Sequence, residues 1–436
     1  MKTKKHTTDV RVVTLGCSKN LVDSENLVTQ LQANDILADH EKGQAAADVV
    51  IVNTCGFIEA AKQESIDTVL HYADMKSRGK LQKLYVTGCL SQRYREDLQH
   101  EIPEVDAFFG TMELPALLSK FDADYKHELI GERTIWTPEH YAYLKISEGC
   151  NRTCSFCAIP LMRGKHVSKP MEAIIAEAQS LVRRGVKEII LIAQELTYYG
   201  LDIYKERKLA ALLDQLAAIE ELAWIRLHYA YPSRFPEEVF DVMARHPNIC
   251  NYIDMPLQHV DDGVLTRMKR QITQEETRAL IGKAREKVPG LCFRTTLMVG
   301  FPGETEQEFA SLCRFVEEIQ FERLGVFEYS HEEQTGAYDL IDNIPPNAKA
   351  QRAGTLMEIQ KAISLKHNEA KLGSDVEVLI DRKEGNSFFG RTEHDSPEVD
   401  NEVVVDAARD FVRVGDFASV EIYDVTEYDL YGILSK

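Results

Sequence analysis

The sequence lacks the long apolar segments that mark membrane and secreted proteins. No apolar run approaches the roughly 18 residues that a membrane-spanning helix requires. The positively charged residues 1–6 are not followed by the apolar stretch of a signal peptide. Low-complexity and collagen-like segments are also missing, and the apolar fraction of 44% is ordinary for globular proteins. We therefore expect a cytoplasmic protein with no membrane partner, and the length of 436 residues indicates about three domains.

Positive charge is scarce in this chain. Lys and Arg number 51 against 70 Asp and Glu, and the formal net charge is −19 at pH 7. Proteins that bind nucleic acid obtain much of their affinity from Lys and Arg on phosphates. The charge therefore argues against a general phosphate-binding surface and favours a basic partner.

Three of the nine cysteines stand close together in the sequence, at Cys150, Cys154 and Cys157, directly after an apolar strand-like run at 141–146. In a reducing compartment, such cysteines are expected to bind metal rather than to form disulfides. A closed zinc or iron–sulfur site takes four protein ligands, whereas this motif ends at three. Three thiolates can hold a four-iron cluster whose fourth iron stays open to a small molecule. The alternative is a zinc knuckle or a set of buried thiols.

Residues 8–125 repeat one unit, an apolar strand followed by a helical pattern, which predicts a parallel α/β domain. The three strands end at Cys17, Cys55 and Cys89, and each of these cysteines adjoins a glycine. Ligand sites in parallel sheets lie beyond the carboxyl ends of the strands, so the three cysteines are expected to converge. The sequence thus predicts a second trio of thiolates. The alternative is that small cysteines simply pack well at strand ends.

Residues 136–366 follow a second α/β rhythm, with helical patterns between strand-like runs at 142–146, 188–192, 224–228, 252–255, 293–299 and 324–329. Six such units predict a partial (β/α)6 barrel of parallel strands, whose functional groups gather at the carboxyl ends. Arg226 and Arg294 are candidates to hold a cofactor carboxylate, because a guanidinium can bind a carboxylate through two hydrogen bonds. The alternative for each is a salt bridge that lines the barrel.

Residues 368–436 contain short strands broken by glycine, asparagine and proline, which predicts a small all-β barrel or sandwich. This segment has 7 Lys and Arg against 17 Asp and Glu, a difference of −10. Small β-barrels that bind RNA use a basic face with aromatic residues. The acidic balance suits a basic protein partner instead.

Together the three segments resemble the methylthiotransferases, a radical SAM family. Residues 8–125 resemble its amino-terminal methylthiotransferase domain, residues 136–366 its radical SAM core, and residues 368–436 its TRAM domain. The resemblance implies two 4Fe-4S clusters, one on each cysteine trio, and S-adenosyl-L-methionine at the open iron of the second trio. It also implies cofactor-binding roles, beside those of the two arginines, for Phe156, Gln194, Glu195 and the turn formed by Gly300, Gly303 and Glu304.

The family divides into enzymes that modify tRNA adenosine and a branch that modifies a ribosomal protein. Residues 158–165, 192–200 and 229–232 resemble the protein-modifying branch, although Glu195 stands where that branch more often has Asp. The resemblance implies methylthiolation of an aspartate β-carbon in ribosomal protein S-twelve of the small subunit, supported by an electron donor. The acidic terminal segment argues against tRNA as the partner. The alternatives are a tRNA adenosine methylthiotransferase, a non-catalytic Fe–S electron carrier with closed clusters, and a zinc-binding scaffold.

Overall fold

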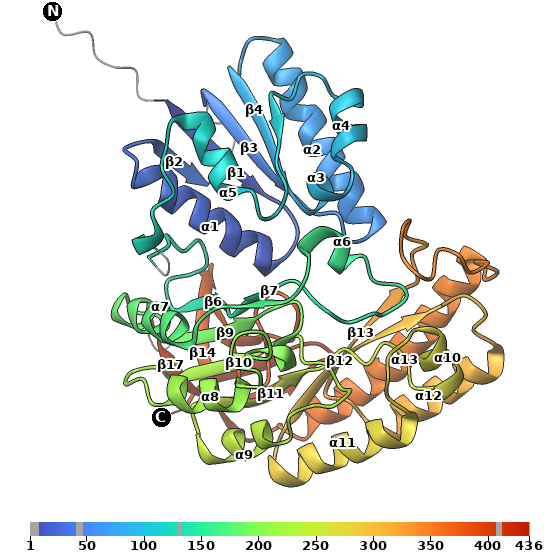
Figure 1. Cartoon of the computed structure of the whole chain (residues 1–436). Coiled ribbons are helices and arrows are strands. Elements are labelled where there is room, and N and C mark those ends of the chain that lie inside the picture. The colour runs from blue at the N-terminus through green and yellow to red at the C-terminus, as the bar shows by residue number, and fades with distance from the viewer. Residues whose placement is uncertain (1–7, 41–46, 130–131, 407–411, 436) are drawn as a thin grey trace, which may run out of the picture.

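The computed structural model describes residues 8–40, 47–129, 132–406 and 412–435, which form three parts (Figure 1). The amino-terminal part is a parallel sheet of five strands in the order β2-β1-β3-β4-β5. The predicted strands are β1 (Asp9–Thr14), β3 (Val49–Thr54) and β4 (Lys83–Gly88). Two further strands, β2 (Leu37–His40) and β5 (Ala107–Phe108), are too short to be recognised from their sequence pattern.

Helices cover both faces of this first sheet. One apolar core lies between the sheet and the helices α1 (Ser18–Gln32) and α5 (Leu114–Leu118). The other lies under α2 (Glu59–Ser77), α3 (Cys89–Arg93) and α4 (Arg95–Glu101). Burial on both sides explains why β3 reads as a continuous apolar run rather than as an alternating strand.

The middle part is an open parallel sheet of six strands in the order β13-β12-β11-β10-β9-β6, which confirms the predicted partial barrel. Its strands are β6 (Tyr141–Lys145), β9 (Glu188–Ile192), β10 (Trp224–Leu227), β11 (Ile249–Asp254), β12 (Cys292–Val299) and β13 (Arg323–Glu328). The outer layer consists of α7 (Met171–Arg183), α8 (Leu209–Ala217), α9 (Glu238–Arg245), α11 (Gln274–Lys287), α12 (Glu306–Ile319) and α13 (Pro346–Glu369). The short helix α10 (Asp262–Arg267) packs instead beside Phe301 and Tyr329.

Local signals account for where two of these helices begin. The side chains of Thr273 and Thr305 each accept a hydrogen bond from the backbone N–H three residues later. The glutamates at those later positions, Glu276 and Glu308, accept a hydrogen bond from the backbone N–H of the threonine in return. Such capping boxes satisfy backbone donors that the first turn of a helix leaves free. Alternate strand residues such as Leu144, Leu191 and Leu227 pack under the helices, so the other residues of each strand face the inside of the partial barrel.

The carboxy-terminal part is a closed five-stranded barrel in the order β14-β15-β16-β18-β17. Its strands are β14 (Asp375–Glu384), β15 (Ser387–Arg391), β16 (Val403–Asp406), β17 (Phe417–Val425) and β18 (Leu430–Leu434). Four of the five strand pairs are antiparallel, whereas β16 and β18 pair in parallel. The predicted small all-β domain is therefore confirmed, with one parallel pair that closes it.

The segment 392–402, between β15 and β16, enters the inner face of the six-stranded sheet. Asp395 pairs with Arg323 of β13, and Asp400 accepts hydrogen bonds from Tyr252 and Arg294. Ser396 lies 2.8 Å from the ring nitrogen Nε2 of His228. The carboxy-terminal part is thus anchored to the middle part by buried polar contacts as well as by the chain connection after α13. We call residues 392–402 the plug segment below.

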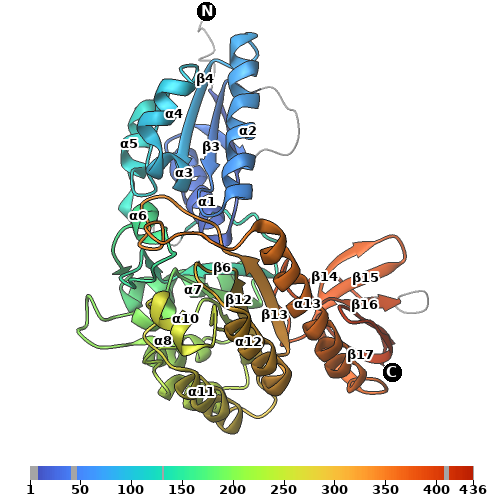
Figure 2. The ribbon, with the colours of Figure 1, turned by 90° about the vertical axis from the view of Figure 1, so that its right-hand side faces the viewer.

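The amino-terminal part sits over the edge of the middle part at which β6 and β13 end (Figure 1), and the carboxy-terminal barrel lies to the side of the middle part in Figure 2. The short helix α6 (Ile159–Arg163) lies at this junction and packs on Cys89 through Ala158 and Met162. A second contact comes from Glu332, after β13, which accepts hydrogen bonds from Lys62 and Arg93 at 3.1 and 2.7 Å. In the part of the chain that the structure describes, no helix is both long and apolar enough to cross a lipid bilayer.

Candidate functional site

The structure brings Cys17, Cys55 and Cys89 together at the carboxyl ends of β1, β3 and β4. A Cβ atom built on Gly16 would lie 2.9 Å from the sulfur of Cys55, which shows how closely the chain passes this thiol. Burial raises the pKa of the Cys89 thiol to about 11, with a smaller contribution from the neighbouring Cys17. The predicted convergence is therefore present. We call these residues the amino-terminal trio.

The second trio, Cys150, Cys154 and Cys157, occupies the loop between β7 (Ser147–Glu148) and α6. Burial raises the pKa of the Cys150 thiol to about 11 and that of Cys157 to about 12, and the neighbouring Cys154 adds to both shifts. Burial therefore disfavours the charged thiolates here, and a cation bound by them would have to offset that cost, because only thiolates act as metal ligands. We call these residues the cluster-loop trio.

Two residues from separate loops, Tyr231 after β10 and Arg270 after α10, contact Cys154. The guanidinium of Arg270 donates to its sulfur at 3.5 Å, and the hydroxyl oxygen of Tyr231 lies 3.5 Å from the same atom. The Tyr231 hydroxyl also donates to the backbone oxygen of Arg270 at 3.0 Å, so the two groups hold each other. Arg270 therefore places a buried positive charge beside this trio.

Arg152, inside the cluster loop, fixes the loop against the barrel. Its guanidinium lies between the rings of Tyr198 and Tyr231, 4.0 and 3.8 Å from their centroids, and pairs with Glu195 at 3.2 Å. Glu195 also accepts a hydrogen bond from the backbone N–H of Thr197 at 2.7 Å. In this structure the carboxylate of Glu195 therefore holds the loop through Arg152.

Arg163, the last residue of α6, connects the two trios. Its Nε donates to the Cys89 sulfur at 3.3 Å, and its Nη1 donates to Asp23 at 2.6 Å. Lys145 pairs with Glu148 at 2.7 Å and also contacts Asp23. Although burial opposes it, Lys145 and Arg163 hold the pKa of Glu148 at about 2, so this carboxylate is ionised. A buried network of ion pairs thus runs from the cluster loop to the amino-terminal trio.

The other predicted cofactor contacts lie along the inner edge of the same barrel. Phe156 packs against a group of apolar side chains that includes Phe301 and Tyr329. Glu304 accepts hydrogen bonds from the backbone N–H groups of Gly300 and Phe301 at 2.6 and 3.2 Å and therefore stabilises the predicted turn itself. Glu304 also pairs with Arg352 of α13 at 3.0 Å.

Arg226 requires a correction. Its side chain is fully buried, pairs with Glu188 at 2.7 Å, and donates to the backbone oxygens of Thr392 and Glu393 in the plug segment. A cofactor carboxylate cannot reach it there. The carboxy-terminal part fills that level of the barrel, and the structure supports the alternative reading of Arg226, a salt bridge that lines the barrel.

Arg294 also faces the plug segment. Its guanidinium pairs with Asp254 at 2.9 Å and with Asp400 at 3.2 Å, and its side chain keeps 18% of its surface exposed. The structure thus supplies carboxylate partners from the chain itself. A role in binding the cofactor carboxylate stays a prediction for this residue.

Two buried polar atoms of the site are left without a protein partner among the described residues, Gln194 Oε1 and Arg270 Nε. An unsatisfied buried polar atom costs about 1–3 kcal/mol, so such atoms mark places where a ligand completes the hydrogen bonding. Gln194 is held toward the cluster loop by its hydrogen bond to Glu148 at 2.5 Å. With three thiols on an open loop, these groups fit an iron–sulfur cluster and a small polar cofactor. Across the described ranges, no His, Cys, Asp or Glu side chains form a group of three or more that could hold a single metal ion.

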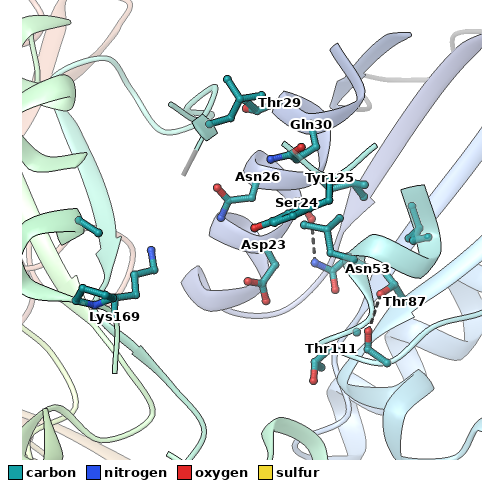
Figure 3. A pocket seen from close by; sticks show the side chains of 18 residues that line it. Asp23, Ser24, Asn26, Thr29, Gln30, Asn53, Thr87, Thr111, Tyr125 and Lys169 are labelled. Carbon is teal, nitrogen blue, oxygen red and sulfur yellow. Dashed lines mark hydrogen bonds between the residues drawn. The ribbon is translucent and has the colours of Figure 1, made fainter. Parts of the chain in front are cut away.

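A cavity of about 350 Å³ lies beside the amino-terminal trio, between α1 and the start of α7 (Figure 3). Asn53 lines it and donates to Ser24 at 2.9 Å, and Thr87 donates to the backbone oxygen of Gly110 at 3.4 Å. These hydrogen bonds fix the end of β3 to α1 and the end of β4 to the segment after β5. Lys169 faces the cavity from the barrel side.

Sequence reasoning missed Arg152, Arg163, Tyr231 and Arg270 as site residues. Arg152 and Arg163 stood within or just after the cysteine motif, so their position was a usable signal. Tyr231 and Arg270 approach Cys154 from segments 77 and 116 residues away in sequence, and no spacing rule predicts such contacts.

Comparisons with known proteins cover all three parts of the chain. The Radical SAM superfamily model matches residues 144–316, the model of the uncharacterized protein family UPF0004 matches residues 9–110, and the TRAM domain model matches residues 372–434. Similar folds occur in the radical S-adenosylmethionine methyltransferase TsrM from Kitasatospora setae, with cobalamin and a [4Fe-4S] cluster bound. That protein is 14% identical, with a TM-score of 0.54, over 74% of this chain and 75% of that chain.

Relatives of high identity match almost the whole chain. Ribosomal protein uS12 methylthiotransferase RimO of Cytophaga hutchinsonii is 60% identical over 98% of this chain and 98% of its own length. The proteins of the same name from Flavobacterium psychrophilum and Bacteroides thetaiotaomicron are 56% and 49% identical, over 97% and 98% of both chains in each pair.

Proposed function

Because this chain belongs to the family of the ribosomal protein uS12 methylthiotransferases, we propose that its two cysteine trios hold the two 4Fe-4S clusters that this family uses. The chain is a radical SAM methylthiotransferase that acts on ribosomal protein uS12. The observation that carries the assignment is the hydrogen bond from Arg163 to Cys89, which brings the cluster loop against the amino-terminal trio. Both sites therefore open toward one junction between domains.

The residues around the trios prepare the site for these groups. When bound, the clusters and S-adenosyl-L-methionine supply the one-electron and radical chemistry that side chains cannot provide. Arg270 offers a positive charge to the Cys154 sulfur, and Arg163 offers one to the Cys89 sulfur. Glu195, at the carboxyl end of β9, holds the cluster loop in place through its ion pair with Arg152 of that loop.

We assign the cofactor-binding side of the barrel to residues on its inner edge. Gln194 keeps one buried oxygen free of protein partners, which supports a direct polar contact. Phe156, within the cluster loop, supplies an apolar surface that packs with Phe301 of the turn between Gly300 and Gly303. Glu195 and Glu304 act through the contacts they already make, with Arg152 and with the turn, and we propose them as positioning residues.

An acidic protein surface supports a basic protein substrate rather than a tRNA. Of the neighbouring strands β14 and β17, Glu377 and Glu421 are exposed, and Glu421 pairs in register with Asp375, which is also exposed. Such carboxylates attract a basic protein and repel phosphates. We propose that this surface contributes to the binding of uS12, that the reaction takes place in the cytoplasm, and that a separate electron donor supplies the reducing equivalents.

Anaerobic incubation of the iron-loaded protein with S-adenosyl-L-methionine, a reductant and purified uS12 tests the function. Mass spectrometry is expected to show a methylthio group added to uS12, and fragmentation is expected to place it on an aspartate. Unmodified tRNA is the matched control substrate. A methylthio group on tRNA adenosine but not on uS12 would overturn the assignment.

We expect Gly16→Ala to remove iron from the amino-terminal trio. Gly16 has φ +88°, and a Cβ there would lie 2.7 and 2.9 Å from the Cβ and sulfur of Cys55, so alanine must displace that side chain. Iron per chain is expected to fall from about eight toward about four, since each four-iron cluster needs its thiolates. Gly185→Ala is the control, because Gly185 has φ +98° with nothing within 4 Å of a built Cβ. Equal iron loss in both variants would contradict the contact with Cys55 as the cause.

We expect the double variant Glu377→Lys/Glu421→Lys to weaken the binding of uS12 by about tenfold at low salt, because exposed charges act mainly through long-range attraction. Binding can be followed by biolayer interferometry over a range of salt concentrations, and the parent is expected to show the steeper salt dependence. Glu286→Lys, an exposed position on α11, reverses a charge elsewhere. Weakening by that control to the same extent would show a general charge effect.

A further inference from the structure

Arg163 belongs to the radical SAM part of the chain but contacts the cysteine trio of the other part. It ends α6, six residues after Cys157, and its side chain is 4% exposed. Nε donates to the Cys89 sulfur at 3.3 Å, Nη1 donates to Asp23 at 2.6 Å, and Nη2 donates to the side-chain oxygen of Asn20. All three nitrogens are therefore used, and the guanidinium has a fixed orientation.

Arg163 belongs to a network of four charged side chains. Two cations, Arg163 and Lys145, face two carboxylates, Asp23 and Glu148, and each cation contacts both carboxylates. The set is electrically balanced before any thiolate is counted. Within it, Arg163 is the member that donates a hydrogen bond to a sulfur of the amino-terminal trio. Its removal would leave one surplus negative charge next to Cys89.

We propose that Arg163 is a positioning residue that sets the reduction potential of the amino-terminal cluster from across the domain boundary. This inference rests on the assignment of that cluster to Cys17, Cys55 and Cys89. Reduction adds one electron to the cluster and neither forms nor breaks a bond. Hydrogen bonds to the cluster's sulfur ligands and nearby positive charge both favour the reduced form. A guanidinium held by two carboxylates supplies both effects with a fixed geometry.

The position of Arg163 also joins the two sites mechanically. The helix α6 begins two residues after Cys157, so the backbone that carries the cluster-loop trio also carries the group that contacts Cys89. Ala158 and Met162 of the same segment pack on Cys89 as well. The cluster loop thereby helps to define the surroundings of the cluster that the other domain holds.

The test measures a potential rather than turnover. In full-length protein with Cys150, Cys154 and Cys157 all replaced by alanine, only the amino-terminal cluster remains, and an EPR-monitored redox titration gives its midpoint. We expect the midpoint to fall in Arg163→Lys and to fall further in Arg163→Gln. Arg163→Gln/Asp23→Asn is expected to recover part of the fall, because it restores the balance of charge around Cys89.

A reciprocal control separates a local effect from a general one. In protein with Cys17, Cys55 and Cys89 replaced by alanine, Arg163→Gln is expected to leave the midpoint of the remaining cluster unchanged. Arg270→Gln, which removes the donor to Cys154, is expected to lower it. Equal midpoints for the parent and Arg163→Gln in the first background, or equal shifts in both backgrounds, would overturn the inference.

Loss of iron is also an informative outcome. If Arg163→Gln does not hold the amino-terminal cluster, the midpoint potential is measured in Arg163→Lys and in the double variant instead. A midpoint in Arg163→Lys equal to that of the parent would overturn the inference. If the parent of the first background binds no iron at all, the assignment of the cluster itself is wrong. The two failures are therefore distinguishable.

Discussion

Replacing Cys55 by alanine is expected to abolish methylthio transfer to uS12 while S-adenosyl-L-methionine is still cleaved. Cys55 is buried at the carboxyl end of β3, and its thiol lies among those of the amino-terminal trio. The cluster-loop trio has its own donors, Arg152 and Arg270, neither of which contacts Cys55. The variant should therefore lose one cluster and keep the other.

Three measurements check this expectation in one sample. Iron per chain should fall from about eight to about four. Deoxyadenosine should still form in the presence of S-adenosyl-L-methionine and reductant, and the methylthio product should drop below detection. Cys154→Ala should lose both deoxyadenosine and product, because it removes a thiolate from the cluster-loop trio.

Cys313→Ala provides the matched control for the loss of a thiol. Cys313 lies half-buried on α12 and belongs to neither trio, so its replacement should retain full iron and both activities. Transfer of the methylthio group at the parental rate by Cys55→Ala would remove the amino-terminal trio from the mechanism. Loss of deoxyadenosine in that variant would show that the two sites are not independent.

The features that could be predicted from the sequence are those that depend on short local patterns, such as apolar strands and cysteine spacing. The apolar strands β1, β3 and β4 are each followed closely by a cysteine, and parallel pairing brings their carboxyl ends to one edge, so the convergence of the amino-terminal trio followed from topology. The cluster-loop trio lies within one short stretch of sequence, so its grouping could be predicted without knowing the topology. The short strands β2 and β5 were not predicted, because segments of four and two residues are too short to show a strand pattern in the sequence.

What the sequence could not predict depends on contacts between separate parts of the chain. Arg226 and Arg294 contact the plug segment inside the barrel, but the sequences of their own strands do not indicate that this segment fills the space next to them. The same holds for Arg163, whose partner Cys89 lies 74 positions earlier in another domain. Charged residues of this kind become interpretable only once the domains are assembled, because each satisfies a buried group on a neighbour.

The plug segment leads to the second large effect, on stability. Asp395 is fully buried and accepts hydrogen bonds from Arg323 Nε at 3.0 Å and from the hydroxyl of Thr392 at 2.6 Å. Although burial opposes it, Arg323 and Lys371 hold the pKa of Asp395 well below its usual range. Asp395→Asn leaves the buried Arg323 charge without its counterion. Removal of one partner of a buried pair costs about 3–5 kcal/mol, so we expect a marked fall in the denaturant midpoint.

Asp416→Asn is the matched control, because Asp416 also pairs across the same pair of domains, with Lys187 at 2.9 Å. In that pair the side chains are 49% and 36% exposed. An exposed pair of this kind contributes about 0–1 kcal/mol, so the control should unfold close to the parent.

The effect of pH provides an independent check on Asp395. Because its folded-state pKa is depressed, the carboxylate stabilises the protein above the unfolded pKa of about 3.9, and this contribution is lost as the pH falls toward the folded value. The stability gap between the parent and Asp395→Asn should therefore be full at neutral pH and narrow below about pH 4. Equal destabilisation by Asp395→Asn and Asp416→Asn at pH 7 would show that the plug segment is not held by a buried charge pair.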